Sequence, residues 1–143
     1  MTLDALAVVV GTRLKEKGLV LATAESCTGG WVAQVVTSVS GSSEWFDRGF
    51  VTYSNDAKRE MIGVRVETLD RHGAVSEETA REMAAGALAA SRAQIAVEGP
   101  GVGVGVDQRK RLHRDHRFKD SSPGAPSLGP GLPRPISNAS VST

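Results

Sequence analysis

Residues 19–30 (LVLATAESCTGG) constrain the fold more than any other stretch of this 143-residue sequence. A short apolar run, residues 19–23, passes directly into a polar, glycine-rich turn that contains Ser26, and residues 31–39 then show helical spacing. A buried strand that is followed at once by a turn and a helix is the unit from which parallel α/β sheets are built. We therefore expect an α/β fold with helices layered around a mainly parallel sheet.

The rest of the first 98 residues continues this alternation of strands and helices. Apolar residues at three-to-four spacing predict a helix over residues 4–17, and Ser76 followed by two glutamates is typical of a helix start. The other segments are predicted strands at residues 49–53 and 94–97 and short helices at residues 55–62 and 66–71. Only three strands are convincing, so we expect the sheet to be incomplete.

The composition changes abruptly after Glu98. All six prolines lie in residues 99–143, which are basic and rich in Gly and Ser. Residues 1–98 are acidic on balance and hold both tryptophans and the single tyrosine. A segment with so little to bury cannot offset the entropy that it would lose on ordering. We therefore interpret residues 1–98 as the folded domain and residues 99–143 as a largely disordered tail.

Several protein classes are disfavoured by the sequence. The single cysteine, Cys27, excludes an intrachain disulfide and fits a reducing compartment. No apolar run approaches the ~18 residues that cross a bilayer, and the N-terminus lacks the basic start of a secretory signal. We expect a cytoplasmic protein without membrane association. There is neither an HExxH motif nor a phosphate loop, so we expect no metal and no cofactor.

Ser26 and the turn that follows it form the first candidate site. If a helix opens near Thr28, the backbone N–H groups of Thr28, Gly29 and Gly30 can bind an anion or a developing oxyanion. Cys27 is an alternative nucleophile, but no histidine is close in sequence, and we interpret it as a packed small residue. The local sequence leaves open whether Ser26 is catalytic or only caps the helix.

Tyr53 and Lys58 form the second candidate site. Tyr53 is expected to end a strand, and Lys58 falls in the first turn of the following helix. Ligands of parallel α/β sheets bind beyond the carboxyl ends of the strands, where Ser26 is also placed. A buried neutral lysine can activate a serine, directly or with a tyrosine that relays the proton. Alternatively, Lys58 is an ordinary solvated residue and Tyr53 is a core aromatic residue with a solvated hydroxyl.

Four segments, in this order along the chain, resemble the CinA C-terminal domain family. They are residues 22–30 (ATAESCTGG), 37–44 (TSVSGSSE), 51–58 (VTYSNDAK) and 72–78 (HGAVSEE). Stand-alone members of that family are nicotinamide-nucleotide amidases. The resemblance implies hydrolysis of nicotinamide mononucleotide to nicotinate mononucleotide and ammonia, in pyridine nucleotide recycling and without a metal or cofactor.

The resemblance also implies roles for individual residues. Ser26 corresponds to the nucleophile, and Tyr53 and Lys58 correspond to the groups that handle its proton. The turn that follows Ser26 corresponds to the cradle for the oxyanion or the substrate phosphate. The residues of this turn are Cys27, Thr28, Gly29 and Gly30.

The resemblance stops near residue 98. Family members continue with a segment similar to TGIAGPGG, further strands and a final helix, whereas residues 98–102 here read EGPGV. We therefore expect a truncated amidase domain whose C-terminus is replaced.

Two alternatives to the amidase remain open. One is an inactive homologue that serves as a binding or dimerisation module. The other is nucleic-acid binding through the basic run at residues 109–119, which we disfavour because such runs are usually solvated. The partners that we expect are a small nucleotide substrate and a second copy of the chain, since an open sheet edge favours self-association.

Overall fold

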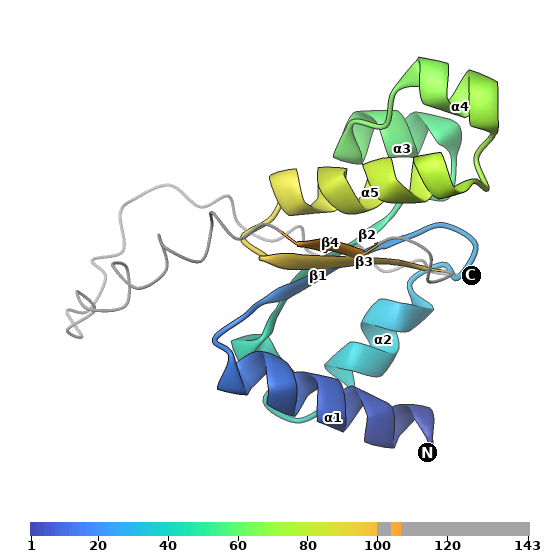
Figure 1. The fold of residues 1–143 in the computed structure, drawn as a ribbon. Coiled ribbons are helices and arrows are strands. Elements are labelled where there is room, and N and C mark those ends of the chain that lie inside the picture. The colour runs from blue at the N-terminus through green and yellow to red at the C-terminus, as the bar shows by residue number, and fades with distance from the viewer. Residues whose placement is uncertain (100–103, 107–143) are drawn as a thin grey trace, which may run out of the picture.

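The computed structural model describes residues 1–99 and 104–106 of the chain. The elements, in chain order, are α1 (Leu3–Glu16), β1 (Leu21–Glu25), α2 (Trp31–Thr37), the 3₁₀ turn η1 (Ser42–Glu44), β2 (Phe46–Val51), α3 (Asn55–Ile62), α4 (Val66–His72), α5 (Glu77–Ala89), β3 (Ile95–Gly99) and β4 (Val104–Val106). Figure 1 shows three layers, with α3, α4 and α5 on one side of the sheet and α1 and α2 on the other. The predicted layered α/β architecture is thereby confirmed.

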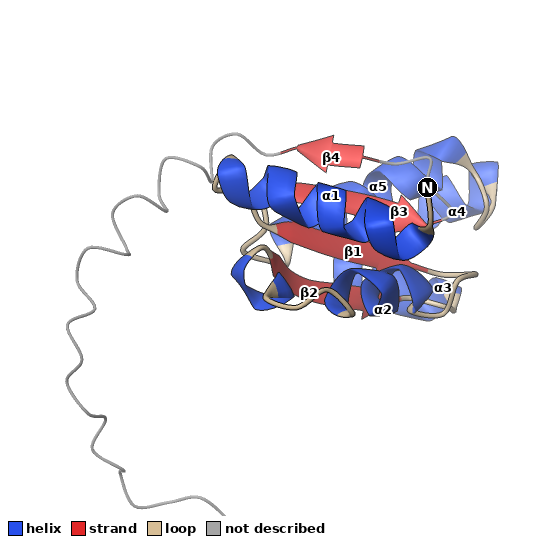
Figure 2. Cartoon of the chain, turned by 90° about the horizontal axis from the view of Figure 1, so that it is seen from below, coloured by secondary structure: helices blue, strands red, loops and turns tan. Residues whose placement is uncertain are grey.

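The sheet has the strand order β2-β1-β3-β4. The central strand β1 pairs in parallel with both β2 and β3, and β4 runs antiparallel to β3 at one edge. Figure 2 shows these strands from the side that α1 and α2 cover. The three strands that we predicted are thus the parallel core of the sheet.

Strand β4 lies in the segment for which we predicted disorder, so that prediction is wrong for residues 104–106. The edge of β3 offers hydrogen-bonding partners to an added strand. A Cβ atom at Gly105 would lie 2.8 Å from Leu88 Cδ1, so α5 approaches this strand closely. Residues 100–103 and 107–143, which include the basic run, lie outside the described residues.

All three predicted strands have different bounds in the structure: β3 covers Ile95–Gly99 instead of residues 94–97, and the change in β2 affects the site. Strand β1 continues to Glu25 instead of ending at Thr23, and β2 covers Phe46–Val51 instead of residues 49–53. The reason is the pairing, because Glu25 aligns with Val51 as the last partner of the ladder. Tyr53 therefore follows the strand instead of ending it.

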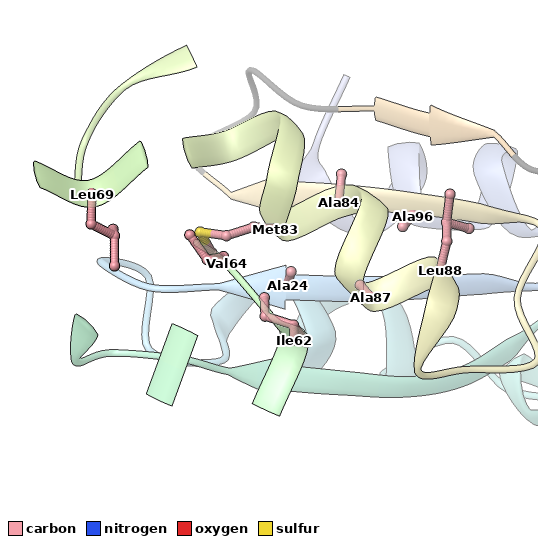
Figure 3. Packing of buried hydrophobic residues seen from close by; sticks show 9 residues of the cluster. All are labelled: Ala24, Ile62, Val64, Leu69, Met83, Ala84, Ala87, Leu88 and Ala96. Atoms are coloured by element: carbon pink, nitrogen blue, oxygen red, sulfur yellow. The ribbon is translucent and has the colours of Figure 1, made fainter. Parts of the chain in front are cut away.

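The two faces of the sheet carry separate apolar cores. The core on the α5 face contains small residues that allow the helix to approach the sheet closely (Figure 3). Its buried members are Ala24, Ile62, Val64, Leu69, Met83, Ala84, Ala87, Leu88 and Ala96. The core on the α1 and α2 face is built on Leu14, Leu21, Val36 and Trp45. None of the described helices combines the length and the apolar content that crossing a membrane requires.

Candidate active site

The structure brings Ser26 and Lys58 together. Ser26 directly follows β1, and Lys58 lies in the first turn of α3, which Ser54 caps by accepting a hydrogen bond from the Ala57 N–H. The Lys58 Nζ atom is 3.0 Å from Ser26 Oγ, and Lys58 is only 1% exposed. The interpretation of Lys58 as a solvated helix residue is therefore wrong. The two predicted sites form one site at the carboxyl edge of the sheet.

Two backbone carbonyls hold the amino group of Lys58 in place. Lys58 Nζ donates hydrogen bonds to the carbonyl oxygens of Thr52, at 2.9 Å, and Tyr53, at 3.4 Å. A neutral amine has two N–H bonds and one lone pair. Lys58 Nζ also donates to Ser26 Oγ; once the amine is neutral and its two N–H bonds are directed at the carbonyls, its lone pair is left for the Ser26 hydroxyl. The neutral form of Lys58 can therefore accept the serine proton without moving.

The surroundings of Lys58 favour that neutral form. Burial lowers the pKa of Lys58, whereas the nearby Cys27 and Glu98 side chains act in the opposite direction. The pKa remains lower than that of a free lysine. A lysine in this state can serve as a general base at a lower pH than a solvated one.

Glu25 is a structural residue of the site that the sequence analysis did not single out. It is fully buried on the α2 face of the sheet. Its Oε1 atom accepts hydrogen bonds from the Thr28 hydroxyl (2.8 Å) and the Val32 N–H (2.7 Å), and its Oε2 atom accepts one from the Ala33 N–H (3.0 Å). Glu25 thus caps α2 and anchors both ends of the turn. A carboxylate at the end of an apolar strand was the signal for such a role.

The turn after Ser26 is shaped by two glycines. Gly29 and Gly30 have φ angles of +62° and +102°, which glycine adopts without strain. The predicted helix start near Thr28 is wrong, since α2 begins at Trp31. The Gly29 N–H donates to the Ser26 carbonyl oxygen at 3.0 Å. Within the described part of the chain, the N–H groups of Cys27 and Thr28 have no such partner and can serve a ligand.

Tyr53 contributes its backbone carbonyl to the site, and the residue is largely exposed. Its carbonyl oxygen accepts the hydrogen bond from Lys58, but the residue is 74% exposed. The interpretation of Tyr53 as a core aromatic residue is therefore wrong. The structure does not bring the Tyr53 hydroxyl to the pair of Ser26 and Lys58.

A cavity of about 260 Å³ opens beside Ser26. It lies between the carboxyl ends of β1 and β3 and the N-terminal end of α5. Its lining residues are Ser26, Cys27, Ala74, Val75, Ser76, Glu77, Ala80 and Glu98. Cys27 lines this cavity and is exposed, so its interpretation as a packed residue is wrong. The nucleophile candidate thus faces a space of small-molecule size.

Glu98 is the second acidic residue that the sequence analysis did not assign to the site. It is 4% exposed, and its Oε2 atom has no hydrogen-bond partner among the described residues. Burial raises the pKa of Glu98, and the positive charge of Lys58 opposes that effect. The described residues contain no group of three or more His, Cys, Asp or Glu side chains that could hold a metal ion.

Fold and site together define a class of protein: a layered α/β domain with a serine–lysine pair at the carboxyl edge of a mainly parallel sheet. Comparison with known sequences then places the chain within this class. The CinA C-terminal domain profile matches residues 3–111, and the chain belongs to that family. The family resemblance of the four sequence segments is confirmed.

Named relatives and solved structures agree with this assignment. Nicotinamide-nucleotide amidohydrolase PncC of Escherichia coli (strain K12) is 63% identical over 93 residues, which are 65% of this chain and 56% of that protein. A CinA-like protein of Chloroherpeton thalassium is 55% identical over 102 residues, 68% of this chain and 24% of that protein. The chain therefore spans about half the length of the amidohydrolase relatives that it matches.

The crystal structure of the competence/damage inducible protein CihA from Agrobacterium tumefaciens superimposes with a TM-score of 0.66 at 53% identity. The match covers 69% of this chain and 63% of that one. A CinA superfamily protein from Escherichia coli gives a TM-score of 0.67 at 36% identity, over 68% of this chain and 56% of that one. The α/β fold of the described residues is therefore the fold of the family.

Proposed function

We propose that the chain is an amidohydrolase that converts nicotinamide mononucleotide to nicotinate mononucleotide and ammonia, as a step of pyridine nucleotide recycling. The observation that carries the proposal is the 3.0 Å contact between the buried Lys58 amine and the Ser26 hydroxyl. It is supported by the names of the relatives, which are called nicotinamide-nucleotide amidohydrolases. We further propose that the enzyme acts in the cytoplasm as a homo-oligomer.

In the first half of the reaction, Ser26 Oγ attacks the carbon of the substrate carboxamide while Lys58 Nζ takes the hydroxyl proton. The N–H groups of Cys27 and Thr28 donate to the oxyanion that forms. The carbon–nitrogen bond then breaks, and Lys58 passes its proton to the leaving amide nitrogen, which departs as ammonia. An ester between the nicotinoyl group and Ser26 remains.

Water completes the reaction. Lys58 takes a proton from a water molecule, and the resulting hydroxide attacks the ester carbon. The ester bond breaks, Lys58 returns the proton to the Ser26 oxygen, and the carboxylic acid that has formed releases its own proton to solvent and leaves as the carboxylate. Water and the amide are the sole reactants, so the site needs no further cofactor. Tyr53 acts here through its carbonyl, which holds the lysine, and no relay through its hydroxyl is needed.

The cavity fits the reactive end of the substrate. Its volume of about 260 Å³ is slightly below the ~300–1,000 Å³ of typical ligand sites. It therefore accommodates the ring and its carboxamide, while the ribose phosphate extends over the rim. Gly29, which is exposed and has open space where a Cβ atom would lie, is our candidate contact for the phosphate together with Gly30.

Ammonia release from nicotinamide mononucleotide tests the proposal. The full chain should release ammonia, and Ser26→Ala should reduce the rate by at least ~10³-fold, because the covalent route is lost. Ser40→Ala, which changes an exposed serine outside the site, is the matched control and should retain full activity. A folded chain without ammonia release, or an active Ser26→Ala variant, would show that the proposal is wrong.

The second candidate is an inactive family member that serves as a binding or dimerisation module. The fact that favours it is that the chain spans 56% of the length of its amidohydrolase relative. Sedimentation of the full chain beside the ammonia assay separates the two candidates. A stable dimer that binds the nucleotide without releasing ammonia would support the module.

A further inference from the structure

Glu98 has a buried carboxylate oxygen to which no described residue donates a hydrogen bond. The residue is 4% exposed, and no described residue donates to its Oε2 atom. Leaving a charged acceptor buried without a partner costs free energy, and such groups are rare in native proteins. Since Glu98 also lines the cavity beside Ser26, a ligand in that cavity can supply the missing donor.

The register of the sheet directs Glu98 toward the reacting centre. Glu98 on β3 pairs with Ala24 on β1, and side chains at paired positions of parallel strands lie on the same face. That face is the α5 face, since Ala24 belongs to its core. Ser26, two positions beyond Ala24, continues along this face, and both Ser26 and Glu98 line the cavity.

The substrate and the product differ in the hydrogen-bonding groups that they present to Glu98. A carboxamide carries two N–H donors on its nitrogen, whereas the product carboxylate carries only acceptors. A carboxylate in the cavity accepts from the amide and repels the acid. Glu77, the other acidic residue that lines the cavity, is exposed and forms an ion pair with Arg81. Of these two cavity carboxylates, Glu98 is therefore the one without a hydrogen bond or ion pair to any described residue.

We propose that Glu98 binds the amide nitrogen of the substrate and makes the site prefer the amide over the carboxylate product. This inference rests on the proposed amidase function. A bond to the Glu98 carboxylate would hold the amide group beside Ser26, which also lines the cavity, and leave the carbonyl oxygen for the N–H groups of the turn. After hydrolysis, two carboxylates would share one cavity, and their repulsion would favour release of the product.

Binding measurements on the full chain with Ser26→Ala, which prevents turnover, test this role. The probes are nicotinamide mononucleotide and nicotinate mononucleotide, measured separately by calorimetry at neutral pH. The Ser26→Ala chain should bind the amide more tightly than the acid. Adding Glu98→Gln should reduce that preference by at least ~10-fold, because the glutamine N–H groups can donate to the acid. Glu78→Gln, an exposed neighbour outside the cavity lining, should leave the preference unchanged.

The outcomes separate this inference from the proposed function. Equal affinities for the two probes, no binding of either, or a preference that survives Glu98→Gln would each overturn the role of Glu98. Ammonia release by the unaltered chain together with a surviving preference would leave the amidase standing without this role. If Glu98→Gln abolishes the preference for the amide and the unaltered chain releases no ammonia, the role of Glu98 in binding is supported and the proposed amidase activity is refuted. Thermal melts of both variants verify that they are folded.

Discussion

Replacing Glu25 tests whether the site depends on the cap that joins β1 to α2. Glu25 is fully buried and holds three donors, two on Oε1 and one on Oε2. Glutamine has the same shape but only one acceptor oxygen. With its carbonyl at the Oε1 position, Glu25→Gln retains the bonds from Thr28 and Val32 but presents an N–H₂ group to the Ala33 N–H.

The expected loss of stability follows from these three contacts. The two retained bonds lose their charge-assisted part, which is about 1 kcal/mol each. The buried N–H of Ala33 loses its acceptor, which costs about 1–3 kcal/mol. The sum is about 3–5 kcal/mol, a large fraction of the ~5–15 kcal/mol that stabilise a typical domain. Glu25→Ala removes both acceptor oxygens, leaves all three donors without a partner and should cost at least as much.

Urea and thermal unfolding measure this loss. For a folded unit of this size, about 1 kcal/mol corresponds to a shift of roughly 4–8 °C in Tm, so Glu25→Gln should lower Tm by more than ~10 °C. Below that temperature, ammonia release should fall by ~10-fold or more, because the turn that carries Ser26 shifts. Glu44→Gln is the matched control, since its exposed ion pair with Lys15 contributes less than ~1 kcal/mol. If the Tm of Glu25→Gln lies within ~3 °C of that of the unaltered protein, the hydrogen bonds of Glu25 to the turn and α2 do not stabilise the fold as argued.

Three further predictions follow from the same contacts. Lys58→Met should reduce ammonia release by ~10²-fold or more while the chain stays folded, with a loss of only ~1–3 kcal/mol because the buried Thr52 carbonyl loses its donor; a chain that keeps its activity would contradict the assigned base. The kcat/KM for nicotinamide mononucleotide should rise with pH as Lys58 loses its proton, and the midpoint should lie below 10.5 because burial lowers the pKa of Lys58. Glu98→Gln should move that midpoint lower still, since the charge of Glu98 raises the pKa of Lys58. A midpoint that does not move in the variant would contradict the coupling between Glu98 and Lys58. Gly86→Ala should lower the free energy of unfolding by ~1–3 kcal/mol although alanine favours helices, because the new Cβ would overlap the carbonyl oxygen of Ile62; an unchanged urea midpoint would contradict this.

Local patterns in the sequence were sufficient for the type and order of the parallel elements. The apolar run before Ser26 and the glutamates after Ser76 indicated β1 and α5 because a strand and a helix start depend on neighbouring residues. The order of the family segments also identified Ser26 and Lys58 as candidate site residues. Strand β4 was missed because it forms by pairing with the edge of β3, and a local sequence pattern does not show that this edge is available.

The chemistry of the site was decided by contacts between distant segments. Whether Lys58 is a solvated residue or a base depends on its burial against Ser26 and Thr52, which no local pattern encodes. The exposure of Tyr53 depends on where β2 ends, and that is set by the pairing of Val51 with Glu25.

The sequence by itself therefore determined the α/β class, the family and the nucleophile candidate, because these follow from residue types and their order. Only the tertiary structure showed that Glu25 holds the turn and that Glu98 reaches the cavity. Both are carboxylates on strands, and their roles depend on which face of the sheet they occupy and on which donors the opposing helix presents there. That arrangement arises from packing between layers, which is a property of the whole fold.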